Sequence, residues 1–510
     1  MITFWPSKSF YPAKWLPFFW AGTLLLSCNY QKDTRTDESI LARIGDRTIS
    51  VNEFIRRAEY TPRPAYCAGD NYIHRKIVLN SLIAEKLLAL EAEDNDELRQ
   101  NQEFQAYLVG RKEQAMRQWF YYKEAFEKVE IDSNDVKPIY QLSGRTYRLA
   151  YLTIDNAEQA AEVQSALAAG GADRFQQVAQ QLSGQLQTPQ REVAFQAVEN
   201  ETMLDSLFTV TRSKNQIVGP VKSEDGNFTF VQILGWTDRK LLSPTDIQRR
   251  WQDAQDWLTE KTASQSYDRI VAQLMKGKTI EFMPETFRKL VNLVGPMYLR
   301  SREQKEQAFS DQFWKKNEEI QLEKQADQMA GEPLFRIDGQ IWSVADFEQE
   351  MQRHPLVFRK RNMAKSEFAE QFKLAIVDMV RDRYVTTAAY EAGYDKAEEV
   401  QRNAQMWRDN LSALYQQNKY LHSLGLVSAF RNEPVKIIES RLNPLIDSLQ
   451  AKYSEKIAID TERFESIKLS RIDLFAVQRN MPFPVVVPSF PMITTDHTLD
   501  YGKSVKNPHE

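Results

Sequence analysis

Cysteine and histidine are both scarce in this chain. Only two cysteines, Cys28 and Cys67, occur in 510 residues, which excludes a disulfide framework and a cysteine-based metal site. The five histidines contain no H-x-x-x-H pair, and this argues against zinc. Glycine is also infrequent, and neither a phosphate-binding glycine loop nor a Gly-x-Ser-x-Gly motif is present. We therefore expect no metal and no cofactor.

An excess of positive charge is also missing. The net charge is −4 and there is no basic tail, so the composition gives no support to nucleic-acid binding. Charged residues make up 27% of the chain, which together with the low glycine content is typical of a helix-rich protein. A chain of 510 residues is too long for one core and indicates about three or four domains.

The N-terminus has the pattern of a targeting segment. Lys8 and Lys14 accompany the apolar stretch Trp15–Leu26, which is short for a membrane span. The stretch ends in Leu25-Leu26-Ser27-Cys28, and this resembles the lipobox of bacterial lipoproteins. The resemblance implies cleavage after residue 27 and acylation of Cys28. An ordinary signal peptide or a buried apolar helix is the alternative.

The residues that follow Cys28 bear on location. Residues 28–39 are polar and are expected to form a tether. Asn29 replaces the Asp that is associated with inner-membrane retention in enteric bacteria. The resemblance therefore implies a lipid anchor on the periplasmic side of the outer membrane, with inner-membrane anchoring left open.

A long internal repeat organises the rest of the chain. Residues Leu41–Phe54 return, without a gap, as Leu334–Phe347. Each copy reads as a strand, a two-residue turn, a second strand and a helix that begins with Ser-x-x-acid. Two hairpin-helix units are therefore expected, capped by Ser50 and Ser343 with Glu53 and Asp346 as capping-box partners.

A second repeat closes each copy. The pattern Ile280-x-Phe282-x-x-Glu285-x-Phe287 returns as Ile457-x-Ile459-x-x-Glu462-x-Phe464. The first copy is longer by about the length of an intervening region that reads β-α-α-α-β-β. We therefore predict a mainly α protein with two copies of one helical module, the first interrupted by an inserted α+β domain. The expected parts are residues 1–27 (signal peptide), 28–39 (tether), 40–143 and 243–293 (first module), 145–240 (α+β domain), 297–330 (linking helix), 333–470 (second module) and 471–510 (irregular tail).

This layout resembles the SurA/PpiC/PrsA group of bacterial foldases. The start at Leu41 and the helix Leu79–Ala92 are similar to the group's N-terminal signature. In the inserted region, Phe175–Ser183 and the stretch from Ile217 to Gly226 resemble the helix and hairpin of parvulin-type peptidyl-prolyl isomerases. The resemblance implies two SurA-N-like modules, a parvulin-like domain, and unfolded or nascent envelope proteins as partners.

The inserted region departs from active parvulins at the positions that matter for catalysis. The group implies histidines in the first and last strands, yet residues 145–240 contain neither histidine nor cysteine. The glycine-rich loop is replaced by Gln187–Glu192. We therefore assign no catalytic residue and expect the parvulin-like domain to be weakly active or inactive. The residues expected to line a remnant proline or client pocket, or else to form ordinary core, are Phe195, Met203, Leu207, Phe208 and Phe230.

Three functions stay open on the sequence alone. The first is a lipid-anchored periplasmic chaperone that binds unfolded envelope or outer-membrane proteins. The second is an active peptidyl-prolyl cis-trans isomerase of the same architecture. The third is a non-catalytic secretion or assembly scaffold lipoprotein. The histidine-free inserted domain favours the first over the second.

Overall fold

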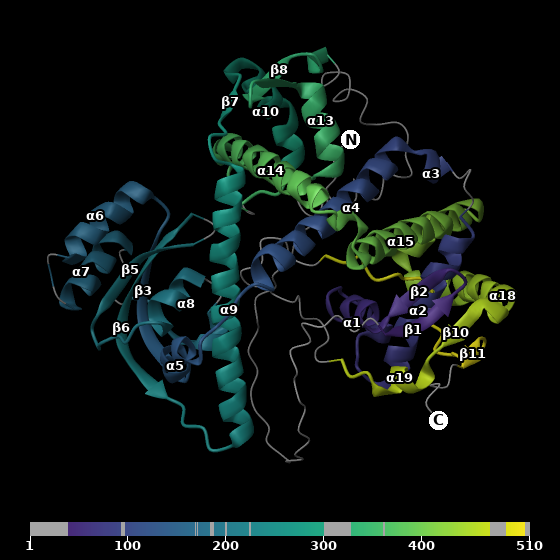
Figure 1. Cartoon of the computed structure of the whole chain (residues 1–510), viewed down its shortest axis with the longest axis horizontal. Helices are drawn as coiled ribbons and strands as arrows, with labels where there is room; N and C mark the ends of the chain where they lie inside the picture. The colour runs from purple at the N-terminus through teal and green to yellow at the C-terminus, as the bar shows by residue number, and fades with distance from the viewer. Residues whose placement is uncertain are drawn as a thin grey trace.

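The computed structural model describes residues 39–92, 97–168, 170, 172–183, 188–198, 201–223, 226–299, 328–360, 363–469 and 486–504. The expected signal peptide, Cys28, nearly all of the tether, and most of the linking helix lie outside these residues. The described part is mostly helical with small, largely antiparallel sheets, which confirms a mainly α protein with an inserted α+β region. Figure 1 shows three parts around the long helix α9.

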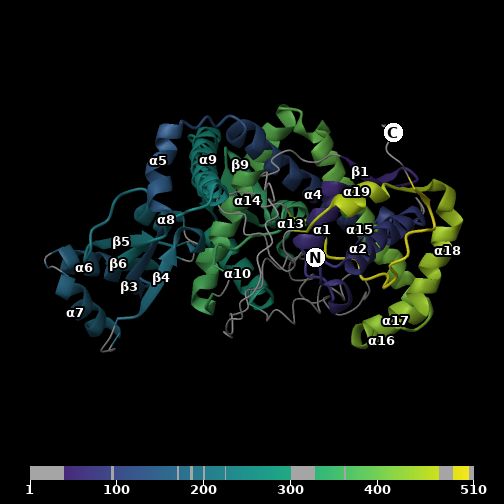
Figure 2. The same ribbon diagram turned by 90° about the horizontal axis from the view of Figure 1, so that it is seen from below.

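The outer lobe combines both ends of the described chain. In Figures 1 and 2 the purple N-terminal elements lie beside the yellow C-terminal ones. Its elements are β1 (Ile40–Ile44), β2 (Arg47–Ser50), α1 (Val51–Glu59), α2 (Tyr72–Leu90), α15 (Glu398–Ser423), α16 (Val427–Asn432), α17 (Pro434–Ile437), α18 (Asn443–Tyr453), β10 (Ile457–Ile459), α19 (Thr461–Ser466) and β11 (Lys503–Ser504).

The inner lobe is built from the middle of the chain. It lies at the top of Figure 1 and is reached from the outer lobe by α3 (Glu97–Gln100) and α4 (Gln102–Tyr121). Its elements are β7 (Ile280–Phe282), α10 (Pro284–Tyr298), β8 (Pro333–Ile337), β9 (Gln340–Ser343), α13 (Val344–Arg353) and α14 (Phe368–Glu391).

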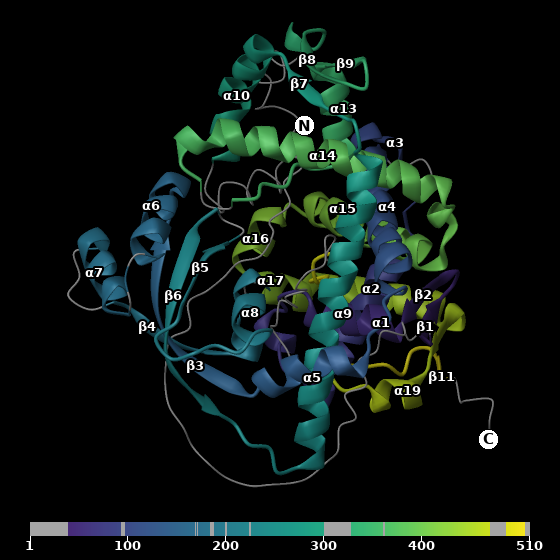
Figure 3. The ribbon, with the colours of Figure 1, turned by 60° about the vertical axis from the view of Figure 1, so that its left-hand side comes forward.

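The α+β domain projects to one side of both lobes, as Figures 1 and 3 show. Its antiparallel sheet has the order β4-β3-β6-β5, with α6 and α7 on one face and α5, α8 and α9 against the other. Its elements are α5 (Ser133–Leu142), β3 (Arg145–Ile154), α6 (Ala157–Ala168), α7 (Ala172–Ser183), β4 (Gln190–Ala194), α8 (Glu201–Phe208), β5 (Ile217–Lys222), β6 (Phe228–Asp238) and α9 (Pro244–Leu274). Strand β4 was not expected, because its sequence Gln-Arg-Glu-Val-Ala carries little apolar alternation.

The two repeats exchange their closing strands. In the outer lobe β1 pairs with β10, so that Ile44 lies opposite Ile457. In the inner lobe β8 pairs with β7, and Ile337 lies opposite Ile280 in the equivalent register. Each sheet therefore joins the hairpin of one copy to the closing strand of the other. This differs from the grouping of residues 243–293 with 40–143, because a repeat shows which segments are equivalent but not which of them pair.

The helices that follow each hairpin unit also cross between the lobes. Helix α15 follows α14 in sequence and packs against α2 of the outer lobe, whereas α4 follows α2 and packs against α13 and α14. The crossing of α4 over α13 is close at Gly110, where an added Cβ would lie 1.8 Å from the Arg353 carbonyl oxygen. Only glycine fits this crossing without movement of the backbone.

The two predicted helix caps differ in detail. The Ser50 side chain accepts a hydrogen bond from the Glu53 amide, as expected, and Ser343 does the same with the Asp346 amide. The Asp346 carboxylate completes a capping box by accepting from the Ser343 amide at 2.8 Å. Glu53 instead forms an ion pair with Lys86 at 2.9 Å. The shorter acid therefore caps its helix, and the longer one reaches across to α2.

The described part of the C-terminal tail, residues 486–504, belongs to the outer-lobe core. Residues 486–502 form no helix or strand, and β11 adds two residues in parallel to β10. Phe490 is 7% exposed and Ile493 is 1% exposed, and both belong to the cluster that contains the β1, β2 and α2 side chains. The tail therefore stabilises the lobe by burying apolar surface.

Candidate functional site

The five residues predicted for a remnant pocket are core residues in the structure. Phe195, Met203, Leu207 and Phe208 lie together under one face of the α+β sheet, and none is more than 5% exposed. Phe230 lies on the opposite face with α6 and α7, because successive residues of β6 alternate between faces. The structure therefore brings four of the five together, without an open face among them.

An aromatic side chain occupies the first strand of the α+β domain, where the resemblance implies a histidine. Tyr147 is fully buried, and its ring lies edge-on to Phe208 at 5.3 Å and to Trp236 at 6.0 Å. Its neighbour Arg145 pairs with Asp238 at 3.0 Å at the exposed strand end. This region therefore packs a domain core.

A buried ion network lies at the centre of the outer lobe. Arg57 donates two hydrogen bonds to the Glu85 carboxylate, at 3.0 and 2.8 Å, and both side chains are fully buried. Beside them, Lys86 pairs with Glu53 at 2.9 Å and with Asp409 at 3.1 Å. Burial opposes the charge of Lys86, but the two carboxylates raise its pKa above the usual value. The charges offset one another, as buried ions require.

Arg57 and two other polar side chains of the outer lobe hold an irregular stretch of the chain's own tail. Arg57 donates to the Ser489 carbonyl at 3.0 Å, and Gln417 donates to the Met492 carbonyl at 2.8 Å. Asn80 donates to the Asp496 carbonyl at 2.9 Å. Side chains of α1, α2 and α15 thus bind an irregular segment through its main-chain oxygens, while Phe490 and Ile493 of the same segment are buried in the core of the lobe.

A cavity opens in the inner lobe beside the residue that aligns with Arg57 of the outer lobe. Alignment of the repeats places Glu350 at Arg57 and Gln340 at Arg47, and here a cavity of about 520 Å³ opens beside β9. Trp342 and Arg383 line it, and Ile341 at its edge is 55% exposed. The residues that line the cavity are Gln340, Ile341, Trp342, Asp346, Gln349, Glu350, Arg353 and Arg383.

A charged pair lies in this cavity. Glu350 comes from α13 and Arg383 from α14, with 3.4 Å between Oε2 and Nη1. In the outer lobe, the residue aligned with Glu350 is the cation Arg57, which pairs with Glu85 of α2. Arg383 also stacks over the Trp342 ring at 4.6 Å and is half exposed. The inner cavity therefore offers hydrogen-bond donors, a carboxylate and apolar surface to a ligand.

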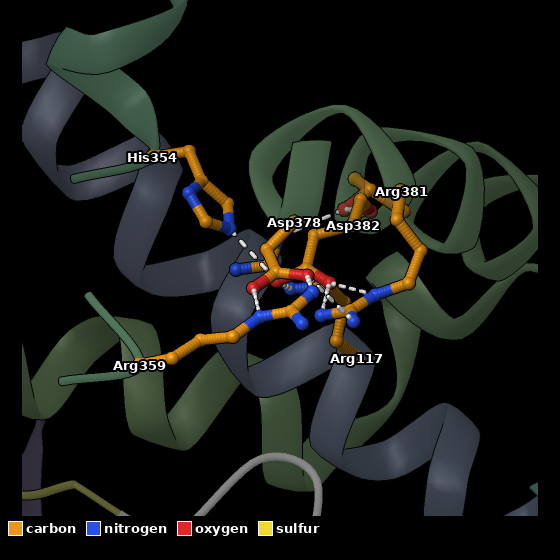
Figure 4. A network of polar contacts seen from close by, with 7 residues as sticks. Arg117, His354, Arg359, Asp378, Arg381 and Asp382 are labelled. Atoms are coloured by element: carbon orange, nitrogen blue, oxygen red, sulfur yellow. Dashed lines mark hydrogen bonds and ion pairs between the residues drawn. The ribbon is translucent and has the colours of Figure 1, made fainter. Parts of the chain in front are cut away.

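A second polar network fastens α4 to the inner lobe (Figure 4). The Nε2 atom of His354, at the end of α13, lies 2.9 Å from Oδ2 of Asp382 on α14. From α4, Arg117 donates to the Thr386 hydroxyl at 2.8 Å and lies 3.9 Å from Asp382. Arg381 adds a hydrogen bond to Asp382 at 2.9 Å.

Asp382 is held in its ionised form. Burial alone would raise the pKa of this carboxyl, but the hydrogen bond from His354 and the charges of Arg117 and Arg381 lower it to about 2. Among the described residues, the polar contact of the His354 ring is with Asp382, and no serine or cysteine nucleophile hydrogen-bonds to it. We therefore assign this network to holding the lobes together.

Other reactive groups offer little chemistry. Cys67 is buried, and burial raises the pKa of its thiol to about 12, so the thiol is unreactive. Among the described residues, no group of three or more histidine, cysteine or acidic side chains could hold a metal ion. Within the same residues, every helix is too short or too polar to cross a bilayer.

The residues of the buried networks were not predicted as site residues. Arg57, Glu85 and Asp382 lie on helices whose charged positions read as solvated faces when each helix is taken alone. The sequence nevertheless indicates that Glu85 and Lys86 are buried, since both interrupt the apolar face of Leu79–Ala92. Charges within an apolar face predict burial with a partner.

Comparisons with known proteins identify no relative: no family model, curated protein or solved structure matches this chain.

Proposed function

We propose that this protein is a lipid-anchored periplasmic chaperone that binds unfolded envelope or outer-membrane proteins, anchored through Cys28. The observation that carries the proposal is that side chains of the outer lobe hydrogen-bond to the carbonyl oxygens of residues 489–496, an irregular segment. A scaffold that recognises main-chain oxygens accepts chains of unrelated sequence, as a chaperone must.

The client site in this proposal is the inner-lobe cavity beside β9. In the outer lobe the tail covers Arg57, whereas no tail segment covers the aligned residue, Glu350, among the described residues. Exposed apolar surface bounded by charge is typical of protein-binding sites, and Ile341 lies next to Arg383 and Glu350. An extended client segment would pack on the exposed Ile341 side chain and accept hydrogen bonds from Arg353 and Arg383.

The parvulin-like domain is a spacer or binding element in this proposal. Isomerisation requires no covalent chemistry, and the uncatalysed barrier is about 18–20 kcal/mol. A pocket that lowers it needs an open apolar cleft, but the five candidate side chains are packed in two closed cores. The active isomerase is therefore the weaker alternative.

Direct binding tests the proposal. Full-length protein is titrated with a fluorescently labelled outer-membrane β-barrel protein kept unfolded in dilute urea, and with two unrelated unfolded proteins. The proposal predicts binding of all three, and loss of binding when each client is folded. Binding of one partner only, in its folded form, would instead support the scaffold alternative. Loss of membrane association in Cys28→Ser would test the anchor.

A further inference from the structure

A second cavity, of about 370 Å³, is lined by residues of β2, α3, α4 and α15 and shares no lining residue with the proposed client site. Four cationic side chains line it: Arg47 from β2, Arg99 from α3, Lys112 from α4 and Arg408 from α15. None of the described residues that line it is Asp or Glu. The volume would hold roughly a dozen waters at about 30 Å³ each, which is room for a diphosphate-sized ligand.

The carboxylates near this cavity are already engaged. The buried Asp409 carboxylate forms ion pairs with Arg47 at 3.0 Å and with Lys86 at 3.1 Å. It also accepts a hydrogen bond from the Gln405 side-chain amide at 2.7 Å. Asp46 pairs with Arg47 at 2.9 Å. Each neighbouring acid is thus shared with at least one cation.

The charges of two of these cations, Lys112 and Arg408, are not fully paired with carboxylates. Asp395 lies 4.0 Å from Lys112, at the limit of an ion pair. Within the described part of the chain, the Arg408 side chain makes no hydrogen bond or ion pair, and it is exposed at the cavity. The cavity therefore concentrates positive charge that these carboxylates do not fully neutralise.

We propose that this cavity binds a phosphate-bearing anion. Guanidinium groups form paired hydrogen bonds to phosphate oxygens, and a lysine supplies a point charge. The cations converge from four elements, and such convergence raises the local positive potential. The phosphate would come from a free polyphosphate or from an anionic lipid headgroup. The proposal is independent of the chaperone function.

Calorimetric titration of the full-length protein at low ionic strength tests this site, with inorganic pyrophosphate and soluble dihexanoyl phosphatidylglycerol as probes. We expect at least one probe to bind more tightly than about 1 mM. Tighter binding of the lipid assigns the site to a headgroup, and tighter binding of pyrophosphate to a free anion. Absence of heat with both probes overturns the proposal.

Paired variants locate the binding. The double variant Arg408→Gln/Lys112→Gln should weaken binding at least about tenfold and keep its melting temperature, because both side chains reach solvent. The matched control, Arg353→Gln/Arg383→Gln, removes two cations from the inner-lobe cavity and should retain the affinity within about twofold. Equal affinities in wild type and the first variant, or equal losses in both variants, contradict the assignment.

Discussion

Arg57 and Glu85 form a two-hydrogen-bond ion pair with neither side chain exposed, and Arg57 also holds the Ser489 carbonyl. One residue thus joins α1, α2 and the C-terminal tail across most of the chain's length. Asn410 of α15 adds a hydrogen bond to the same Glu85 carboxylate. The folding of the outer lobe therefore depends on segments from both ends of the described chain.

Removal of Arg57 should destabilise the outer lobe strongly. Arg57→Ala leaves the buried Glu85 carboxylate without its cation, and we expect a loss of about 3–5 kcal/mol in the free energy of unfolding. Hydrogen exchange of residues 486–496 should accelerate, because the Ser489 contact is lost. The control Arg402→Ala removes an exposed helical pair with Glu398 and should cost about 0.5 kcal/mol or less. Equal losses in the two variants would contradict this account.

The Asp382 network should make stability depend on acid pH. The pKa of Asp382 is about 2 in the folded protein, below the value of about 3.9 in an unfolded chain. The ionised carboxylate therefore stabilises the fold by about 2–3 kcal/mol above pH 4, and this contribution is lost as the pH falls toward 2. Urea unfolding of wild type and Asp382→Asn at several pH values measures it. The stability difference should shrink from about pH 5 downward, and a constant difference would disprove the assignment.

The crossing of α4 and α13 should tolerate no side chain at position 110. Gly110→Val would place carbon atoms against the Arg353 carbonyl, so either α4 moves or the lobe unfolds. We expect a loss of about 3 kcal/mol or more, measured by chemical denaturation. Gly331→Ala is the control, because an added Cβ there meets nothing within 4 Å, and it should change stability by about 0.5 kcal/mol or less.

The α+β domain should show little isomerase activity. The full-length protein, assayed with a protease-coupled prolyl peptide, should give a rate close to the uncatalysed rate, because Tyr147 is buried where a histidine is implied and the candidate pocket is closed. Phe208→Ala should then change stability without changing this rate. Turnover far above background, abolished by Phe208→Ala in a protein that stays folded, would support an active isomerase instead.

In this protein the sequence predicts local structure better than it predicts which distant segments pair. The Leu41–Phe54 and Leu334–Phe347 hairpins, their serine caps and the helices α2 and α14 follow from turn chemistry and periodicity, which act within a few residues. The sequence does not predict strand β4, because Gln190–Glu192 are polar and show no apolar alternation. The helix expected at 297–330 and the lipidation at Cys28 lie largely outside the described residues.

The candidate sites were harder to predict for a physical reason. The exchange of β7 and β10 joins segments far apart in the sequence, and a repeat carries no information about which copy pairs with which. Arg57 and Arg408 are both arginines on amphipathic helices, yet one is buried and the other faces a cavity. Only the packing of α15 and the tail distinguishes them.

Suppression of aggregation tests the central claim most directly. A denatured outer-membrane protein is diluted into buffer with a several-fold excess of wild type, Ile341→Asp or Val357→Asp, and light scattering is followed. Both substituted side chains are exposed, at 55% and 64%, but only Ile341 lines the inner-lobe cavity. We predict suppression by wild type and Val357→Asp and a clear loss with Ile341→Asp. No suppression by the wild-type protein would contradict the chaperone account, and equal suppression by all three would contradict the cavity as its client site.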